Sequence, residues 1–440
     1  MHSARGRAAG LAAGVLSAAL ALTACGGDSG SSSSTDSGGD TSSEGGDVEL
    51  TVSLFGTFGY EESGLFEAYE ASHPGVTIAY ESVQQEDEYW PALQTRLNAG
   101  SGVADVYGIE VGRIRDVANN QADKWVDLTT TAAGDQLAKF PDWKTAAATT
   151  EDGKVLGMGT DIGPMAICYR SDLLEQAGLP TDPADLAAEM GSWEDYVALG
   201  KEFQAGAPEG TAWTDASSGL YNSIISTESE IYYDEAGELI WDSNEAVKNA
   251  FDLAAQAGTD GLTANVQQFS PEWNQGFVSG SFATLACPSW MIGYIKGQAG
   301  DAGSGQWNVT GLPGGAGGNW GGAYLAIPTA SEHQEAAAEL VAWLTAGEQQ
   351  AAVFENVGNF PSNTDGIAAV GDVTDDYFSG APIGEIFGAV AEAAPTQILG
   401  DDDGVIKNQL SRALDSVVAN GVDPAAAWET AATDISNEIG

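Results

Sequence analysis

Apolar and polar residues alternate near the start of the patterned part of the chain. Leu50, Val52 and Leu54 follow the period of two that a half-buried strand requires, and a glycine-containing loop at 56–60 ends the run. Glycine and proline then interrupt the pattern at intervals. Four elements are predicted next: a helix around 65–69, a strand over 76–80, a helix around 93–97 that ends at Gly100, and a strand over 103–109.

Later segments continue this exchange of strands and helices. Residues 166–169 are predicted to form a strand, and Ser192 with Asp195 has the spacing of a capping box at the start of a helix. Helices are also predicted around 246–257 and over 335–353. Because strands and helices alternate, the chain is predicted to be an α/β protein with parallel strand pairing.

The composition excludes several classes of protein. The 440 residues carry 15 Lys and Arg against 64 Asp and Glu, a formal net charge of −49, and 43% of them are hydrophobic. This length suggests about two or three domains, and the hydrophobic fraction is sufficient to give each a buried core. Nucleic acid and anionic membrane surfaces are excluded as partners, because binding them requires many Lys and Arg side chains.

The first 24 residues have the features of a secretory signal peptide. Arg5 and Arg7 precede an apolar run over 8–22 that is too short and too weakly apolar for a membrane-spanning helix. Residues 22–25, Leu-Thr-Ala-Cys, resemble the lipobox of bacterial lipoproteins. The resemblance implies that the chain is cut before Cys25 and that the sulfur of Cys25 receives a diacylglycerol. The alternative is an ordinary cleavage site beside a chance cysteine.

The segment after this cysteine has no side chain that can order it by burial. Residues 26–47 consist only of Gly, Ser, Thr, Asp and Glu. We therefore interpret residues 25–47 as a lipidated cysteine followed by a flexible linker. Two acyl chains anchor a protein stably where one is marginal. The folded part is thus predicted to work at the extracellular face of the cytoplasmic membrane while tethered to it.

Several stretches of the remaining chain form an ordered set, at residues 50–56, 66–76, 99–106, 167–173, 192–196, 277–290 and 321–328. In sequence and in order they resemble the extracellular solute-binding proteins, family 1, of ABC importers. Within that family the nearest resemblance is to sugar-binding lipoproteins, such as the actinobacterial proteins that bind cellobiose and related oligosaccharides. The most diagnostic stretch is Phe277 to Ala283 followed by Trp290, where family members carry a Phe, a Gly, a small residue and a Trp.

The resemblance implies a periplasmic-binding-protein-like fold of type II. Such a fold has two α/β lobes joined by hinge crossovers, with a ligand cleft between the lobes that closes on binding. Lobe 1 is expected at 48–160 plus 322–362, and lobe 2 at 161–321 plus 363–440. The glycine cluster 311–322 is then a candidate crossing between the lobes.

The same resemblance implies a protein that is not an enzyme. It is expected to capture a carbohydrate, such as a cello-oligosaccharide or another di- or oligosaccharide, and to deliver it to the permease subunits of an ABC transporter. We expect a monomer that needs no cofactor and no metal.

Sugar rings present apolar C–H faces edged by hydroxyl groups, so a site for them needs flat aromatic side chains and polar groups with fixed directions. Residues at strand ends, beside glycines or at positions that match the family are the candidates: Phe58, Tyr60, Glu110, Asp161, Trp273, Asn274, Trp290 and Trp320, with Gln84, Gln85 and Glu86 as further candidates. Trp290 matches the family's ligand-stacking tryptophan. The alternative for Trp290 is a place in the core, and for Trp320 it is packing at the hinge. For Phe58, Tyr60 and Glu110 the alternative is simple exposure to solvent, and for Asp161 it is a bond to the backbone.

Three cysteines are present, and Cys25 accounts for one of them. Cys168 and Cys287 both lie on predicted strands of lobe 2. In an oxidising compartment they are predicted to form a disulfide, and the alternative is a pair of buried free thiols.

Other chemistry finds little support in the sequence. The acid runs 375–376 and 401–403 lack the ligand spacing of a calcium loop, and His73 and His333 do not fit a zinc site or a catalytic triad. A secreted glycoside hydrolase is the main competing function, but no motif places the pair of carboxylates that it requires. A binding protein for another solute, such as a polyamine, is the third hypothesis.

Overall fold

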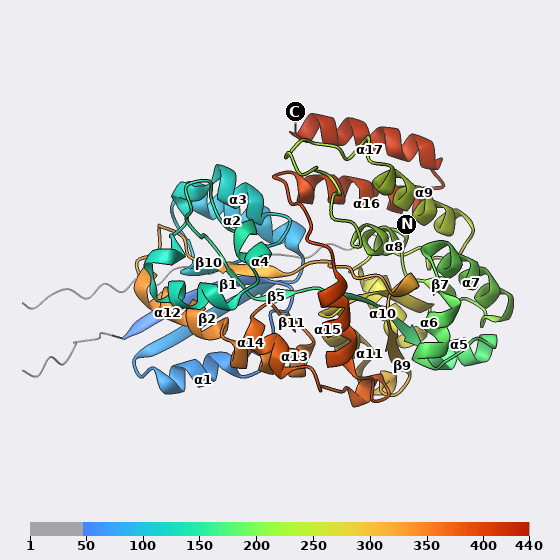
Figure 1. The fold of residues 1–440 in the computed structure, drawn as a ribbon, viewed down its shortest axis with the longest axis horizontal. Coiled ribbons are helices and arrows are strands. Elements are labelled where there is room, and N and C mark those ends of the chain that lie inside the picture. The colour runs from blue at the N-terminus through green and yellow to red at the C-terminus, as the bar shows by residue number, and fades with distance from the viewer. Residues whose placement is uncertain (1–46, 440) are drawn as a thin grey trace, which may run out of the picture. The chain divides into compact units, whose positions relative to one another are not determined.

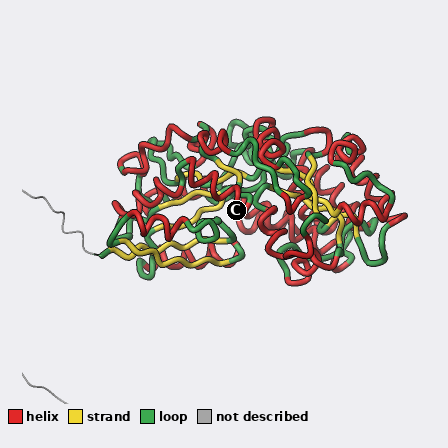
Figure 2. Tube along the Cα trace, turned by 90° about the horizontal axis from the view of Figure 1, so that it is seen from below, coloured by secondary structure: helices red, strands yellow, loops and turns green. Residues whose placement is uncertain are grey.

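Two separate β-sheets, each covered by helices, organise residues 47–439, the part of the chain that the computed structural model describes (Figure 1). Figure 2 shows the strands of these sheets in two groups. We call the part around the five-stranded sheet lobe 1 and the part around the four-stranded sheet lobe 2. The predicted signal peptide 1–24 and Cys25 lie outside the described residues, as does the linker up to residue 46.

The boundaries of the first strands agree with the sequence pattern to within a few residues. The strands are β1 Val48–Phe55, β2 Val76–Val83, β3 Val106–Glu110, β4 Met158–Gly159, β5 Asp161–Ile162, β6 Met165–Arg170, β7 Ala212–Thr214, β8 Phe282–Pro288, β9 Trp307–Thr310, β10 Ala323–Ala326 and β11 Phe360–Pro361. The α-helices are α1 Leu65–Ser72, α2 Glu86–Ala99, α3 Ile114–Asn120, α4 Asp142–Ala147, α5 Ser171–Ala177, α6 Pro183–Glu189, α7 Trp193–Gly206, α8 Ser217–Ile225, α9 Glu245–Thr259, α10 Pro271–Ser279, α11 Met291–Ala299, α12 Gln334–Leu344, α13 Gly347–Val357, α14 Thr364–Ala369, α15 Ile383–Ala393, α16 Asp403–Asn420 and α17 Pro424–Ile439. Short 3-10 helices are η1 Ala122–Lys124, η2 Leu128–Thr130, η3 Ala132–Lys139, η4 Gly300–Gly303, η5 Pro313–Gly315 and η6 Asp376–Phe378. Among residues 47–439, no helix is long and apolar enough to span a membrane.

Lobe 1 is built on a sheet with the strand order β2-β1-β3-β10-β4. β1 pairs in parallel with β2 on one side and with β3 on the other, as the alternation predicted. β10 comes from much later in the chain and runs antiparallel to β3 and β4. Leu50, Val52 and Leu54 are at most 1% exposed, in a core that includes Leu340 of α12. The two-residue period of β1 therefore marks the centre of lobe 1.

Lobe 2 has the strand order β7-β8-β6-β9, and here the prediction of parallel pairing is wrong for most of the sheet. β6 runs antiparallel to both β8 and β9, whereas β7 pairs in parallel with β8. Alternation does not fix strand direction here, because the helices α5 to α10 lie between β6 and β8. A connection of that length can return the chain to either end of the sheet, so the next strand can run in either direction.

Two helix predictions can be compared with the structure. Ser192 caps α7 as predicted, because its hydroxyl accepts the main-chain N–H of Asp195 at 3.1 Å. The same hydroxyl donates to Asp195 Oδ2 at 2.9 Å, which is side-chain pairing and not the reciprocal main-chain bond of a full capping box. The single helix predicted over 335–353 is wrong, since α12 and α13 are separate helices with a break at Thr345. The side chain of Gln350 stabilises the break by donating to the carbonyl of Thr345 at 3.2 Å.

Three chain crossings lie side by side between the two sheets. β5 pairs antiparallel with β11, and Pro164 forms a bridge with Asn319 of the glycine-rich crossing. Gly163 donates its N–H to Asn319 Oδ1 at 2.9 Å and accepts the N–H of Trp320 at 2.8 Å. A Cβ at Gly163 would lie 1.9 Å from the Trp320 carbonyl oxygen, so glycine is required there. The predicted lobe boundaries stay a prediction, because the described residues form one compact unit.

A disulfide joins Cys168 on β6 to Cys287 on β8, the pair expected from the sequence. The Cα atoms are 5.4 Å apart on neighbouring strands, and both side chains are fully buried. The sequence separation of 119 residues means that the bridge restricts the unfolded chain strongly.

The double variant Cys168→Ala/Cys287→Ala is expected to have a free energy of unfolding about 2–5 kcal/mol below that of the wild type, because the unfolded chain regains its freedom. Denaturant titration of both proteins measures the difference. Labelling the unfolded wild type without reductant, followed by peptide mapping, checks the bond itself. Reactive thiols at these two positions, or equal stabilities, would contradict a stabilising bridge.

The first turn of α16 buries a carboxyl group. Asp403 is 8% exposed, its Oδ2 accepts the N–H of Gly400 at 3.1 Å, and among the described residues its Oδ1 has no hydrogen-bond partner. Burial raises the pKa of Asp403 to about 8. The folded chain therefore keeps a proton that the unfolded chain releases near pH 4. It follows that Asp403 lowers the free energy of unfolding progressively as the pH rises from about 4 to about 8.

The variant Asp403→Asn keeps an acceptor for Gly400 but cannot titrate. Its free energy of unfolding is expected to exceed that of the wild type by a margin that grows from about pH 5 to about pH 8, on the order of 1 kcal/mol per pH unit. Urea titrations across this pH range measure the margin. A margin that does not change with pH would mean that Asp403 is already ionised in the folded protein.

Candidate functional site

Two tryptophan rings meet where the crossing 318–322 reaches lobe 2. Trp290 immediately precedes α11, and its ring makes an edge-to-face contact with the ring of Trp320, with centroids 5.9 Å apart. The indole N–H of Trp290 donates to the main-chain carbonyl of Trp320 at 3.1 Å. Both side chains are only partly buried. These two predicted residues therefore form an aromatic corner beside the hinge, and we use that name for them below.

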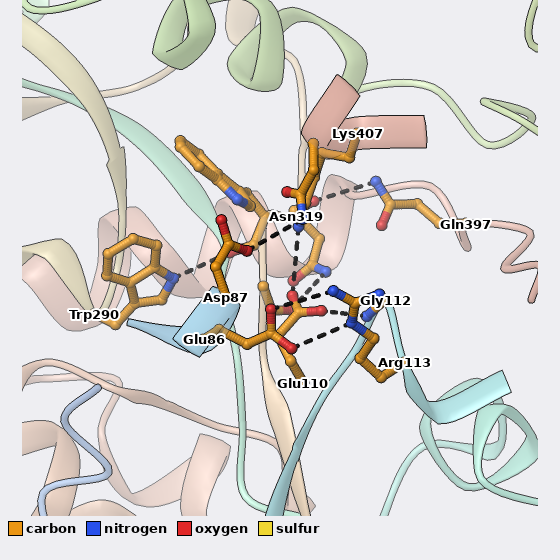
Figure 3. A network of polar contacts seen from close by, with 12 residues as sticks. Glu86, Asp87, Glu110, Gly112, Arg113, Trp290, Asn319, Gln397 and Lys407 are labelled. Carbon is orange, nitrogen blue, oxygen red and sulfur yellow. Dashed lines mark hydrogen bonds and ion pairs between the residues drawn. The ribbon is translucent and has the colours of Figure 1, made fainter. Parts of the chain in front are cut away.

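Lobe 1 contributes charged side chains that follow its strands (Figure 3). Arg113 donates through Nε and Nη2 to the two carboxylate oxygens of Glu86, at 3.2 and 3.4 Å. Glu110, the last residue of β3, accepts the main-chain N–H of Gly112 at 2.5 Å. Burial raises the pKa of Glu86, and the charge of Arg113 opposes this rise. The two-pronged bond holds the guanidinium of Arg113 in one orientation.

Side-chain contacts connect this part of lobe 1 to the segment 401–408, which begins α16 of lobe 2. Each contact joins one residue of lobe 1 to one of that segment: Glu110 Oε1 with Lys407 Nζ at 3.6 Å, Asp87 Oδ1 with Asn408 Nδ2 at 3.2 Å, and Asn119 Nδ2 and Asn120 Nδ2 with Asp401 at 2.7 and 3.0 Å. All of these groups are polar and can exchange their partners for water. The contacts therefore let the two lobes meet without fixing them together.

Neutral amide side chains lie between the aromatic corner and α16. Asn319 donates through Nδ2 to the carbonyl of Gly321 at 3.2 Å, and its Oδ1 accepts the main-chain N–H of Gly163. Gln397 donates to the carbonyls of Asn319 and Ser226 at 3.2 and 3.3 Å. Figure 3 shows both amides in the same group as Trp290 and the charged residues. Amide oxygens and N–H groups can exchange such bonds for those of hydroxyl groups.

A cavity of about 320 Å³ lies beside the hinge and is lined by residues of both lobes. Its wall includes Asn319 and Gln397, together with Arg115 and Trp143 of lobe 1. Trp143 is 36% exposed, which is unusual for so large an apolar side chain in this protein. A larger hollow of about 770 Å³ is lined by lobe 1 alone, within residues 115–151. The aromatic corner, with the polar side chains around it, is the candidate site, because it lies where the crossing between the lobes meets lobe 2. The cavity is a separate hollow beside it, since neither Trp290 nor Trp320 is among the residues that line it.

The structure corrects three of the candidate residues. Phe58 and Tyr60 belong to the core of lobe 1, at 6% and 3% exposure, and their rings contact each other at 6.0 Å. Trp273 is 0% exposed in lobe 2, where its N–H donates to Asp215 Oδ2 at 2.8 Å. Phe58 and Tyr60 follow β1 and pack back into the core of lobe 1, whereas Trp273 packs from α10 into a core of lobe 2. They stabilise the lobes instead of facing the cleft.

The remaining candidates divide between structure and site. Asp161 is 9% exposed and its Oδ1 accepts the main-chain N–H of Ala323 at 2.9 Å, which is the backbone alternative. Asn274 accepts the hydroxyl of Tyr294 at 2.6 Å. Trp290 and Trp320 form the aromatic corner, Glu110 meets Lys407 of α16, and Glu86 pairs with Arg113. Gln84 and Gln85 are exposed residues before α2. Among the described residues, no group of three or more His, Cys, Asp or Glu side chains is arranged to hold a metal ion.

Several residues around the site were not predicted from the sequence: Arg113, Asn319, Gln397 and Lys407. A signal existed for Arg113, because the chain has only 15 Lys and Arg and this one follows Glu110 by three positions. Lys407 reaches lobe 1 through folding of distant segments, so local sequence carries no signal for it.

Comparison with known proteins relates this geometry to a family. The family model described as bacterial extracellular solute-binding protein matches residues 64–377. A crystal structure of an extracellular solute-binding protein of family 1 is 40% identical to this chain, with a TM-score of 0.75. That match covers 89% of this chain and 99% of the other.

Two curated relatives match shorter stretches. The arabinooligosaccharide-binding protein of Bacillus subtilis (strain 168) is 28% identical over 174 residues, which are 39% of this chain and 37% of the relative. The lactose-binding protein of Rhizobium radiobacter is 28% identical over 194 residues, 43% of this chain and 44% of the relative. The matched part of this chain therefore spans less than half the length of either relative.

The fold agrees with these similarities. The two-lobed, periplasmic-binding-protein-like fold predicted from the sequence is confirmed by the match to a solved structure over nearly all of its length. The family model covers more than half of the chain, including all four strands of lobe 2's sheet and both tryptophans of the aromatic corner. This chain therefore belongs to the bacterial extracellular solute-binding proteins.

Proposed function

We propose that the protein captures a di- or oligosaccharide by closure of its two lobes and delivers it to the permease of an ABC importer. The aromatic corner of Trp290 and Trp320 carries this proposal, because it lies at the hinge where both lobes meet. Aromatic rings bind the apolar face of a sugar and have few torsions to freeze. Binding at the hinge would couple the ligand directly to the position of the lobes.

The charges near the corner favour an uncharged ligand. Arg113 is paired with Glu86, and Lys407 lies 3.6 Å from Glu110, so each cation already has a carboxylate partner. A neutral sugar leaves these pairs in place, whereas an acid or an amine would compete with them. The curated relatives are named for arabinooligosaccharides and for lactose, which supports a carbohydrate. Cello-oligosaccharides are the specific sugars that we propose on the sequence resemblance.

The location that we propose is the extracellular face of the cytoplasmic membrane. A lipid on Cys25 would hold the protein there after removal of residues 1–24, and the family to which the chain belongs is extracellular. If residues 26–47 form the flexible linker that their composition predicts, its r.m.s. reach would be roughly 25 Å, at about 5–6 Å per root residue. This reach would let a monomer turn its cleft toward a permease in the same membrane.

A glycoside hydrolase needs two carboxyl groups that are free to exchange protons and to attack the sugar. The two glutamates of the charged group, Glu86 and Glu110, are instead held by Arg113 and by Lys407 with Gly112. This arrangement favours binding without catalysis. Release of reducing ends from an oligosaccharide, in proportion to the protein added, would overturn it.

A thermal-shift panel should detect the ligand class. We expect at least one of cellotriose, arabinotriose and lactose to raise the melting temperature, since a ligand at 100 times its Kd adds about 2.7 kcal/mol of stability. Spermidine serves as the comparison, because the chain's net charge of −49 attracts polyamines. Stabilisation by spermidine and by none of the sugars would contradict a carbohydrate ligand.

The variant Trp290→Ala is expected to weaken binding of the stabilising sugar at least about tenfold, a loss of about 1.4 kcal/mol, because the ring's stacking surface is removed. The melting temperature of the empty protein should fall only slightly, since the ring is partly exposed. Isothermal titration measures the affinity.

Trp143→Ala is the matched control, because it removes the exposed tryptophan that lines the cavity beside the hinge. Its affinity is expected to equal that of the wild type. The reverse result, with affinity lost in Trp143→Ala and kept in Trp290→Ala, would move the sugar from the aromatic corner into the cavity.

A further inference from the structure

The loop that leads into α10 holds a phenylalanine in an unusual backbone conformation. Phe269 has φ 64°, in the left-handed region that bulky residues rarely adopt, and Asn265 in the same loop has φ 56°. Such residues persist only where their surroundings impose the conformation, and they are concentrated at ligand sites. The left-handed conformation of Phe269 must therefore be imposed by the contacts around it.

A buried carboxylate holds the loop on both sides of Phe269. Asp215 is 0% exposed, and its Oδ2 accepts from Gln268 Nε2 and from Trp273 Nε1, both at 2.8 Å. Gln268 directly precedes Phe269, and Trp273 follows it by four residues. A Cβ at Gly219 would lie 2.5 Å from Gln268 Nε2, so the glycine leaves room for this bond. The carboxylate of Asp215 thus clamps the loop before and after Phe269.

The clamp sets the ring of Phe269 beside the aromatic corner. Its plane is inclined by 27° to that of Trp290, with centroids 6.3 Å apart, and both side chains are only partly buried. A sugar ring between them would need about 7–8 Å, twice the 3.5–4.0 Å contact distance of carbon atoms. The two rings are therefore too close to sandwich a ligand, and a ligand that contacts both has to meet them from outside the gap between them.

We propose that Phe269 is a second sugar-stacking residue, which extends the surface of Trp290 to accept a neutral ligand of at least two sugar units, and that Asp215 is its positioning residue. This inference rests on the proposed function. The alternative is that Phe269 only covers Trp273, whose ring centroid is 5.0 Å away.

Two variants at one position test the role of the ring. Phe269→Ala and Phe269→Gly both remove it, so both are expected to bind cellotriose, arabinotriose or lactose at least about tenfold more weakly than the wild type by isothermal titration. Phe269→Gly should melt at a higher temperature than Phe269→Ala, because glycine adopts positive φ without strain. Affinities within twofold of the wild type in both variants would overturn the role of Phe269. Failure of the wild type itself to bind any of the three sugars would instead contradict the carbohydrate proposal and this inference with it.

A double-mutant cycle tests the role of Asp215. Asp215→Asn loses the anionic acceptor that serves two donors, and we expect it to weaken sugar binding when Phe269 is present. In the Phe269→Gly background the same change should cost no further affinity, although both backgrounds lose stability. Equal loss of affinity in both backgrounds would overturn the positioning role, since Asp215 would then act independently of the ring.

Discussion

The close approach of Gly163 to Trp320 is the constraint on which the candidate site depends. Because Gly163 has no Cβ, the crossing 318–322 lies directly against it and exchanges main-chain and side-chain hydrogen bonds with it. The carbonyl of Trp320 is then in place to accept the indole N–H of Trp290. A larger side chain at position 163 would push the crossing away and separate the two tryptophans. The spacing of the lobes and the aromatic corner are therefore set by the same few atoms.

The contacts across the cleft are weak enough for this hinge to work. Glu110 and Lys407 are a partly exposed pair at 3.6 Å, and pairs of this kind contribute about 0–1 kcal/mol. The neighbouring amide–carboxylate contacts also have water as an alternative partner. Separation of the lobes thus exchanges protein contacts for hydration at a small net cost. A ligand that contacts both lobes therefore needs only a moderately higher affinity for the closed arrangement to shift the equilibrium toward it.

The sequence predicted the parts of the fold that depend on local pattern. Leu50, Val52 and Leu54 placed β1, and Ser192 placed the start of α7, because period and capping chemistry act over a few residues. The direction of β8 relative to β6 was not predictable in this way, since several helices separate them. The same limit applies to the site. Its charged contacts join residues such as Asp87 and Asn408, which are brought together only by the crossings.

Trp273 and Trp290 show why residue type did not separate core from cleft. Both are tryptophans in lobe 2 near the ends of regular elements, and both bury part of the same aromatic cluster. What distinguishes them is the partner of the indole N–H, a buried carboxylate for Trp273 and a hinge carbonyl for Trp290. That carboxylate belongs to Asp215, which is 58 residues before Trp273. The residues next to either tryptophan in the sequence therefore do not predict its partner.

Burying Asp215 at 0% exposure is costly, and burial raises its pKa, while the donors of Gln268 and Trp273 oppose that rise. The left-handed backbone of Phe269 adds a further cost of about 1–3 kcal/mol. A glycine at 269 would avoid the backbone cost. An apolar residue at 215 would leave the buried indole N–H of Trp273 without its acceptor, so the buried carboxylate is retained together with Trp273. Local choices that disagree with stability are expected where a protein meets its ligand. Both costs support the loop that carries Phe269, whose ring centroid lies 6.3 Å from that of Trp290.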